Sequence, residues 1–327
     1  MKNRLNNLSI YRIIATVAIL QFHVFFILYD RDIPYEMLMS KGVQGLTALS
    51  GFLYSRKKIT DGRAFLLKSS KKLLPPALIC IGIMAVWNLV YMLAVGGNYF
   101  SLFFDERSYN GALLIQPGNY YYLLYIFICY LLTPYLAKSK RHRVAITAVA
   151  VACELALGFF FGTSIILTTY LVGYLVGLGG YERYTDRRYR LREPLIWMLI
   201  LTAAFGGYAL TVSFPAPSGY ILSHLHSLAN NICSATFGMS TFFVIAYLAK
   251  FTNGERFFSV LKYTDSLCLS VFLLNQTFMC GAMNVAAWVD IRVAQIALVY
   301  AFTIFTAVLV NFITPKIVGL FSRKAKA

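Results

Sequence analysis

Ten stretches of mostly hydrophobic residues recur along the chain, and only short polar segments separate them. A helix needs about 20 such residues to cross the hydrocarbon core of a bilayer. We place the stretches at residues 8–28, 42–55, 75–95, 120–137, 144–161, 163–179, 194–212, 226–249, 265–288 and 293–315. The pattern predicts an all-α, polytopic transmembrane bundle of about ten helices, with one domain over residues 1–327. Stretch 42–55 is short for a crossing, and a partly re-entrant course is the alternative.

Charge follows the same pattern. Charged residues are only 13% of the chain, whereas soluble proteins contain about a quarter. The loops assigned to the inner side hold 25 of the 30 Lys and Arg residues, the outer loops hold four, and Arg12 lies within a stretch. Cytoplasmic loops are enriched in basic residues, so both termini are expected in the cytoplasm. Because this bias accounts for the net charge of +17, we expect no nucleic-acid partner.

The cysteines, the first stretch and the aromatic clusters are expected to have structural roles. All six cysteines lie inside hydrophobic stretches without the spacing of metal ligands, so we expect packing roles and no metal site.

The first stretch is long enough to span, and no small-residue cleavage site follows it, which predicts a membrane helix rather than a cleaved signal peptide. Aromatic clusters at 120–122 and 159–161 fall near predicted boundaries, where such rings anchor helices at the headgroups.

Two ionisable residues in the first stretch are candidates for chemistry. Arg12 and His23 are eleven residues apart, which places them on one helix stripe about 16 Å apart along the axis. An ionisable group inside a membrane helix usually faces a polar cavity. Arg12 is then expected to hold an anionic or carbonyl group, and His23 to act as a base on a hydroxyl. The alternative is that Arg12 snorkels to inner headgroups and His23 only bonds a neighbouring helix.

Other polar residues inside or near the stretches leave two interpretations open. Glu154 is the only acid well inside a stretch, and it is either a partner of Arg12 or His23 or a neutral acid facing another helix. Asn231 and Asn275 are either cavity amides for sugar hydroxyls or bonds between helices. His224 and His226 are assigned to an outer loop, where they either contact the acceptor or occupy incidental surface positions. His142 lies among basic loop residues, and no role is expected for it.

An Arg, ten residues and a His in a first helix resemble the signature of the acyltransferase-3 family, bacterial multi-pass enzymes that acylate sugars and other acceptors. Further matches follow in the order of the family's motifs. They are Gly42, Val43, Leu49, Ser50, Gly51, Phe52 and Leu53 in the second stretch; Phe65, Lys68, Lys72, Leu73, Leu74, Pro75 and Pro76 in the basic inner segment; Tyr121, Tyr122, Leu123, Tyr130 and Pro134; and Tyr263, Ser266, Phe272 and Leu273.

The chain also departs from the family pattern. Ser9 stands where the family often has Asp, and Lys replaces Arg at positions 68 and 72. Ser69 interrupts the usual basic pair, and Asn275 occupies the position of a common late His. The chain therefore resembles a divergent subgroup, in a short form without an appended extracellular domain.

The resemblance implies acyl-CoA, commonly acetyl-CoA, as donor substrate. Lys68, Lys71 and Lys72 are then expected to hold its phosphates, although ordinary positive-inside residues are an equal alternative. Arg12 and Ser50 would line the donor path, with helix packing as the alternative for Ser50. Tyr121, Tyr122 and Asn275 are the expected acceptor-binding residues, and Glu154 would assist Arg12 and His23 in catalysis.

The resemblance thus implies an O-acyltransferase of the bacterial cytoplasmic membrane. Its partners would be the lipid bilayer, acyl-CoA and a sugar or glycan acceptor. His23 would deprotonate the accepting hydroxyl or prime an acyl relay. The alternative from a different class is a glycan or small-molecule exporter that uses the same polar stripe without chemistry.

Overall fold

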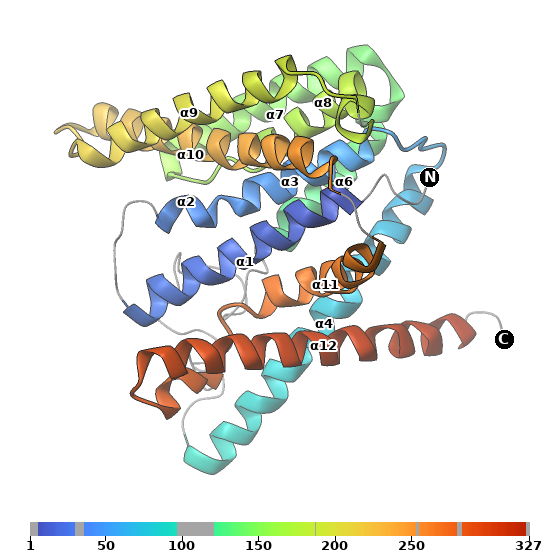
Figure 1. Cartoon of the computed structure of the whole chain (residues 1–327), viewed down its shortest axis with the longest axis vertical. Helices are drawn as coiled ribbons and strands as arrows, with labels where there is room; N and C mark the ends of the chain where they lie inside the picture. Colours follow the sequence, from blue (N-terminus) through green and yellow to red (C-terminus); the bar gives the residue numbers. More distant parts are fainter. Residues whose placement is uncertain are drawn as a thin grey trace. The chain divides into compact units, whose positions relative to one another are not determined.

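Every regular element in the computed structural model is helical within the residues that it describes, which are 6–29, 36–96, 121–186, 188–252, 255–279 and 283–324 (Figure 1). The ten helices of thirteen residues or more in these ranges are α1 (Asn6–Tyr29), α3 (Gly42–Tyr54), α4 (Gly62–Val95), α6 (Tyr121–Lys138), α7 (Lys140–Phe161), α8 (Leu167–Thr185), α9 (Arg192–Ser213), α10 (Tyr220–Ala249), α11 (Glu255–Leu274) and α12 (Arg292–Lys324). Two short elements accompany them, α2 (Glu36–Ser40) and η3 (Val285–Trp288). The expected all-helical fold is confirmed.

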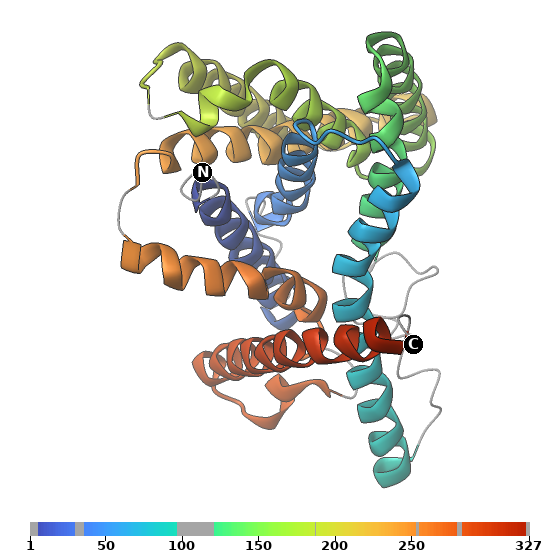
Figure 2. The same ribbon diagram turned by 90° about the vertical axis from the view of Figure 1, so that its right-hand side faces the viewer.

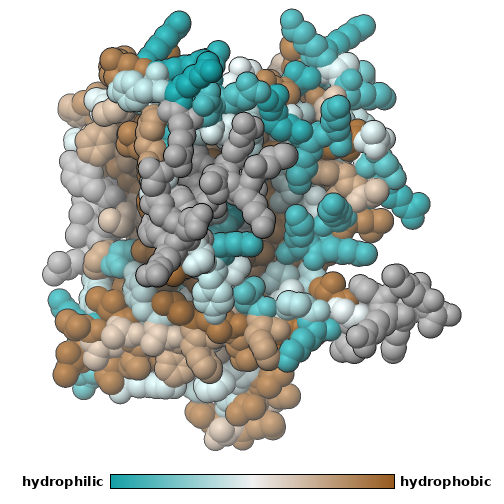
Figure 3. All heavy atoms as spheres, turned by 45° about the vertical axis from the view of Figure 1, so that its right-hand side comes forward, coloured by the Kyte–Doolittle hydropathy of each residue, from teal (hydrophilic) through white to brown (hydrophobic). Residues whose placement is uncertain are grey.

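Six of these helices are long and apolar enough to cross a membrane: α1, α4, α7, α9, α10 and α12. Their outward faces carry large hydrophobic side chains, such as Leu93, Phe161 and Leu199, which are 70–75% exposed. Hydrophobic side chains also reach the surface over wide areas of the face drawn in Figure 3. Such exposure is costly in water and natural in lipid. The chain is therefore a multi-pass membrane protein.

The chain divides into two compact units. The first unit comprises Met1–Ala18, Ile33–Leu66 and Tyr125–Lys262. The second unit comprises Ile19–Asp32, Leu67–Leu124 and Tyr263–Ala327. Helices α1, α4, α6 and α11 each contribute residues to both units.

Close helix packing organises the first unit around α3, which lies alongside α10 in Figure 1. A Cβ added at Gly173 of α8 would lie 2.1 Å from the carbonyl oxygen of Ala48, and one at Gly51 would lie 2.0 Å from that of Tyr170. Gly238 of α10 stands equally close to the carbonyl of Lys41. Small residues let backbones approach in this way where lipid supplies no hydrophobic drive between helices. Ten of the thirteen residues of α3 are consequently buried.

Aromatic side chains fill the core of the first unit beside these contacts. Phe52 of α3 packs against Phe242 and Phe243 of α10 and stacks on Tyr181 of α8. Trp197 of α9 stacks on Phe243 at 4.1 Å between ring centroids. Rings of this size bury much apolar area each, so this cluster ties α3, α8, α9 and α10 together.

The second unit packs its C-terminal helix against the segment before it. Figure 2 shows η3 lying beside α12. The Phe302 ring of α12 contacts Phe278 and Trp288, with centroids 5.8 and 5.5 Å apart. The Tyr29 hydroxyl at the end of α1 donates to the backbone carbonyl of Arg292, 2.9 Å away. These contacts join the end of α1, the segment before α12 and α12 itself within the second unit.

Three expected boundaries are wrong. The basic segment before residue 75 is helical from Gly62, because Asp61 accepts hydrogen bonds from the backbone N–H groups of Arg63 and Ala64 and so caps the helix. Helix α10 begins at Tyr220 rather than 226, which places His224 and His226 on a helix instead of in a loop. The continuous crossing expected over 265–288 is interrupted, since α11 ends at Leu274.

Candidate active site

His23 of α1 is contacted by Gln276, which follows the end of α11. The Gln276 amide nitrogen lies 3.0 Å from Nδ1 and 3.2 Å from Nε2 of the imidazole. The neighbouring Phe22 ring meets the imidazole edge-on at 4.9 Å. Both His23 and Gln276 belong to the second unit, so the contact lies within one compact body.

The backbone that carries Gln276 is not helical. Residues 275–279 form turns, in which Thr277 N–H donates to the Leu274 carbonyl and Met279 N–H donates to that of Gln276. Asn275, Gln276 and Thr277 are consecutive polar residues, and the low helix propensity of Asn and Thr disfavours a continuing helix. Irregular backbone at membrane depth is tolerated only where protein buries it or where it lines a polar cavity. The interruption therefore marks a specialised position.

Asn275 is the most unusual member of this turn. Its side chain is 1% exposed, and neither its amide nitrogen nor its amide oxygen has a hydrogen-bond partner among the described residues. A buried polar group left unsatisfied costs about 1–3 kcal/mol. Thr277, two residues on, donates to the sulfur of Met84 at 3.6 Å. Asn275 is thus a buried donor and acceptor pair beside the residue that contacts His23.

Two further contacts surround this region of the second unit. Tyr122 is buried, and its ring packs edge-on against Phe272 of α11 at 4.9 Å. The Tyr300 hydroxyl of α12 donates to the side-chain oxygen of Gln21, 2.5 Å away. Tyr122 therefore lies against the same helix that ends beside Asn275. The side chain of Tyr121 lies outside the described residues.

Arg12 lies on α1 in the first unit and is half-buried. Its backbone carbonyl accepts a hydrogen bond from the Thr16 hydroxyl, 2.8 Å away. Helix α1 is continuous from Asn6 to Tyr29, so Arg12 and His23 stand on one helix with the spacing expected from the sequence.

Glu154 of α7 makes three hydrogen bonds to backbone groups. Its Oε1 accepts from the N–H groups of Ile166 and Leu167, and its Oε2 from that of Thr168, each at 2.6 Å. These N–H groups open α8, and the first N–H groups of a helix have no partner within it. The carboxylate of Glu154 therefore caps α8 from outside and meets the positive end of its dipole.

The expected donor-binding residues lie on α3 and α4. Lys68, Lys71 and Lys72 are exposed along the first turns of α4. Ser50 lies inside continuous α3, where its hydroxyl donates to the Leu46 carbonyl at 3.0 Å. This local bond gives Ser50 a partner within its own helix. Asn231, the other expected cavity amide, donates to the carbonyls of Gly162 and Thr163 and so joins α10 to the α7–α8 connection.

Comparison with known proteins decides the class. The family model of the acyltransferase domain matches residues 5–314. The chain belongs to the acyltransferase-3 family. Acyltransferase activity follows from this membership, and the resemblance seen in the motifs is confirmed. No curated protein and no solved structure matches the chain.

Beside the candidate residue His23 of this acyltransferase, the structure places one residue that the motifs do not contain. Gln276 is 253 positions from His23 in the sequence and belongs to none of the motifs that carry the family resemblance. The available signal was the run of three polar residues, 275–277, inside an otherwise hydrophobic stretch. Within the described ranges, no group of three or more His, Cys, Asp or Glu residues lies close enough to hold a metal ion.

Proposed function

We propose that this acyltransferase moves an acyl group, acetyl in the simplest case, from cytoplasmic acyl-CoA to a hydroxyl of a cell-envelope sugar or glycan precursor. His23 is the proposed base. The observation that carries this proposal is the contact of His23 with Gln276 at the interrupted end of α11. The family membership favours transfer chemistry over export without chemistry.

In the proposed reaction, His23 takes up one proton and later gives the same proton away. A ring nitrogen of His23 takes the proton of the acceptor hydroxyl as the oxygen attacks the thioester carbonyl. The carbon–sulfur bond of the tetrahedral intermediate then breaks, and the CoA sulfur leaves with the proton that His23 holds. The products are an O-acyl ester and free CoA, and His23 returns to its neutral form.

Gln276 is proposed to orient His23 for this step. Its terminal amide presents either a nitrogen or an oxygen after a half-turn of the side-chain amide. With the oxygen toward the ring, Gln276 accepts from the ring N–H, and the ring nitrogen that carries no proton is the proposed base. The same oxygen stabilises the imidazolium that forms during the reaction, as the third group does in hydrolase triads.

The remaining assignments extend this proposal to both substrates. Asn275 and Tyr122, with Tyr121, are proposed to contact the acceptor, since the Asn275 amide has a donor and an acceptor to offer to sugar hydroxyls. Arg12 is proposed to hold a part of acyl-CoA remote from the thioester, because it stands about 16 Å from His23 along α1. Lys68, Lys71 and Lys72 are proposed to attract the donor's phosphates, with Ser50 beside the donor path. Glu154 needs no catalytic role, because its carboxylate is engaged by α8.

The cellular setting completes the proposal. The expected cytoplasmic termini would give acyl-CoA access from the inner side of the bacterial cytoplasmic membrane. The family match runs across residues of both units, which supports one functional domain rather than two.

The test is transfer by the purified protein. The full chain in detergent, given radiolabelled acetyl-CoA and membrane-envelope glycan, is expected to release CoA and label the glycan. His23→Ala is expected to lose this activity while keeping the thermal unfolding temperature. Full activity in His23→Ala would remove His23 from the mechanism. Mass spectrometry of envelope glycans from a deletion strain and its parent identifies the acceptor by the loss of an acyl group.

A further inference from the structure

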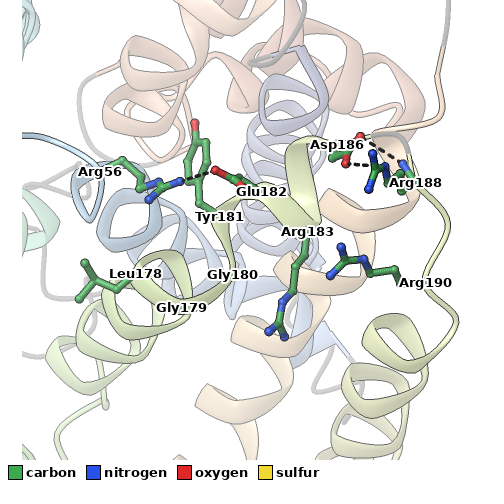
Figure 4. Close-up of a pocket in the computed structure, with 10 residues that line it drawn as sticks. All are labelled: Arg56, Leu178, Gly179, Gly180, Tyr181, Glu182, Arg183, Asp186, Arg188 and Arg190. Atoms are coloured by element: carbon green, nitrogen blue, oxygen red, sulfur yellow. Dashed lines mark hydrogen bonds and ion pairs between the residues drawn. The ribbon is translucent and has the colours of Figure 1, made fainter.

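The first unit contains an arginine-rich cleft of about 480 Å³ at the end of α8 (Figure 4). Its lining comprises Arg56, Leu178, Gly179, Gly180, Tyr181, Glu182, Arg183, Asp186, Arg188 and Arg190. We call the four arginines of this set the arginine cluster. The volume falls within the range of small-molecule sites. The basic segment of residues 181–192 lies between the sixth and seventh hydrophobic stretches, a position that the expected cytoplasmic termini place on the inner side, the side from which acyl-CoA is expected.

The arginine cluster carries more positive charge than its acidic neighbours balance. Arg56 pairs with Glu182 at 3.0 Å, and Arg188 pairs with Asp186 at 3.5 Å. Arg183 pairs with Glu193, which lies beside the cleft, at 2.6 Å. Among the described residues, the guanidinium of Arg190 forms no ion pair. Four guanidinium groups therefore face three carboxylates.

Two of these ion pairs are exposed enough to be exchanged for another anion. The side chains of Arg56 and Glu182 are 47% and 79% exposed, and those of Arg188 and Asp186 are 81% and 50% exposed. In the third pair, Glu193 is only 16% exposed. Exposed ion pairs contribute about 0–1 kcal/mol. Guanidinium groups bind phosphate in bidentate fashion, with bonds about twice as strong as those between neutral groups. A phosphate entering the cleft can therefore compete with the carboxylates for Arg56 and Arg188, and can bind Arg190, which has no ion pair among the described residues.

Two residues at the C-terminal end of α10 hold the backbone of Arg183, Arg188 and Arg190 in place. Lys250, which follows the helix, is 6% exposed, and its ammonium donates to the backbone carbonyls of Arg183 and Arg188, at 2.8 and 3.0 Å. The Tyr247 hydroxyl accepts from Arg190 N–H and donates to the Arg190 carbonyl. Burial lowers the pKa of Lys250. Arg183, Arg188 and Arg190 thus project from a fixed backbone, which reduces the entropic cost of binding.

The floor of the cleft is open and partly aromatic. Helix α8 departs from helical geometry at Gly180, which redirects the last turn before the arginine cluster. Nothing lies within 4 Å of a Cβ built at Gly179, so space remains above this backbone. The Arg56 guanidinium lies over the Tyr181 ring at 5.4 Å, and that ring stacks on buried Phe52.

We propose that the arginine cluster is a phosphate-binding site that takes the phosphate-bearing nucleotide end of acyl-CoA. This assignment rests on the proposed function for its ligand. It places the donor's phosphates at Arg56, Arg183, Arg188 and Arg190, all of which belong to the first unit. The phosphate of a lipid headgroup has the same chemistry and is the second source that an experiment separates.

Equilibrium binding tests the assignment without relying on catalysis. The full chain in detergent is titrated with CoA, with inorganic pyrophosphate, and with short-chain phosphatidylglycerol against phosphatidylcholine. The double variant Arg183→Gln, Arg190→Gln is expected to bind CoA and pyrophosphate about tenfold more weakly or worse. The control pair Lys140→Gln, Arg141→Gln removes the same charge at exposed positions of α7 outside the cleft and is expected to bind like wild type.

The outcomes separate the hypotheses. Unchanged CoA, pyrophosphate and lipid binding in the cleft variant overturns the phosphate site. Weaker phosphatidylglycerol binding with unchanged CoA binding overturns the donor assignment and leaves a lipid-phosphate site. If cleft-dependent CoA binding is present but wild type transfers no acyl group, the site stands and the proposed function fails. Arg188→Gln, at an 81% exposed side chain, gives a second variant should the double variant unfold.

Discussion

The amide nitrogen of Gln276 lies 3.0 Å from Nδ1 of His23, although 253 positions separate the two residues in the sequence. This contact joins the first helix of the chain to the turn that interrupts the ninth hydrophobic stretch. A histidine on a straight helix has a free choice of ring orientation, whereas a partner on irregular backbone restricts that choice. The contact with Gln276 therefore restricts the orientation of the His23 ring.

Gln276→Ala is predicted to lower kcat by about 10- to 100-fold, because His23 loses the group that selects its tautomer and ring orientation. The KM for acetyl-CoA should change little, since Gln276 is not placed on the donor. Steady-state transfer kinetics measure both quantities. Gln276→Glu places an oxygen acceptor toward the ring and should recover part of the lost rate.

The control for this prediction is Gln295→Ala. Gln295 makes a side-chain bond to the Val289 carbonyl at the start of α12, so its loss removes one hydrogen bond of the same kind. A loss of kcat in Gln295→Ala as large as in Gln276→Ala would show that a general effect on folding is responsible.

Asn275→Ala is predicted to separate function from stability. Because the amide of Asn275 has no partner among the described residues, its removal should leave the thermal unfolding temperature unchanged or raise it. The KM for the acceptor should rise about tenfold or more, because the acceptor hydroxyls lose a hydrogen-bonding group. Asn311→Ala, which removes an exposed amide bonded to Ser266, is the control. Unchanged acceptor kinetics in Asn275→Ala would exclude Asn275 from the acceptor site.

Glu154→Gln is predicted to destabilise the protein by about 1–3 kcal/mol while the folded fraction keeps its kcat. The amide replaces one of the two capping oxygens with an N–H group that faces the N–H of Thr168. Denaturant titration in detergent reports the stability, and activity per folded molecule reports kcat. Asp290→Asn makes the same chemical change at an exposed position and should leave both the stability and kcat unchanged. A large fall in kcat at wild-type stability would instead assign Glu154 a catalytic role.

Gly173→Ala is predicted to lower stability by about 1–3 kcal/mol through overpacking between α8 and α3. The added Cβ would stand 2.1 Å from the backbone oxygen of Ala48, which has no rotamer with which to move away. Gly206→Ala in α9 is the matched control, because nothing lies within 4 Å of its added Cβ. That substitution should be neutral or stabilising, since alanine favours a helix over glycine. Equal unfolding temperatures for the two variants would contradict the close packing of α3 and α8.

The hydrophobic pattern predicts the helices well and their ends less well. Helices α3 and α9 begin and end within two residues of the stretches expected for them. The N-terminal extension of α4 was missed because hydropathy reports suitability for lipid, whereas Asp61 starts that helix in a basic, water-compatible segment. The interruption after Leu274 was missed because a few polar residues scarcely alter the mean hydropathy of a long window.

The residues of the candidate site were likewise only partly predictable from the sequence. His23 and Arg12 were identifiable because an ionisable residue in a membrane helix is costly wherever its neighbours lie. Gln276 was not, since its importance depends on a tertiary contact with α1. Glu154 was identifiable because a buried acid in a membrane helix is costly. Its partners are backbone N–H groups of α8, and the residue types in the sequence do not predict them. The arginine cleft depends on Lys250 and Tyr247 fixing a backbone segment some sixty residues away.

Helix α3 is short because protein, not lipid, surrounds it. With α8 and α10 against its backbone, its thirteen residues need not match the thickness of the hydrocarbon layer. A thicker or thinner bilayer would act first on the lipid-facing helices, such as α9, and only indirectly on α3. The aromatic core around Phe52 is thereby insulated from changes in lipid composition that tilt or stretch the outer helices.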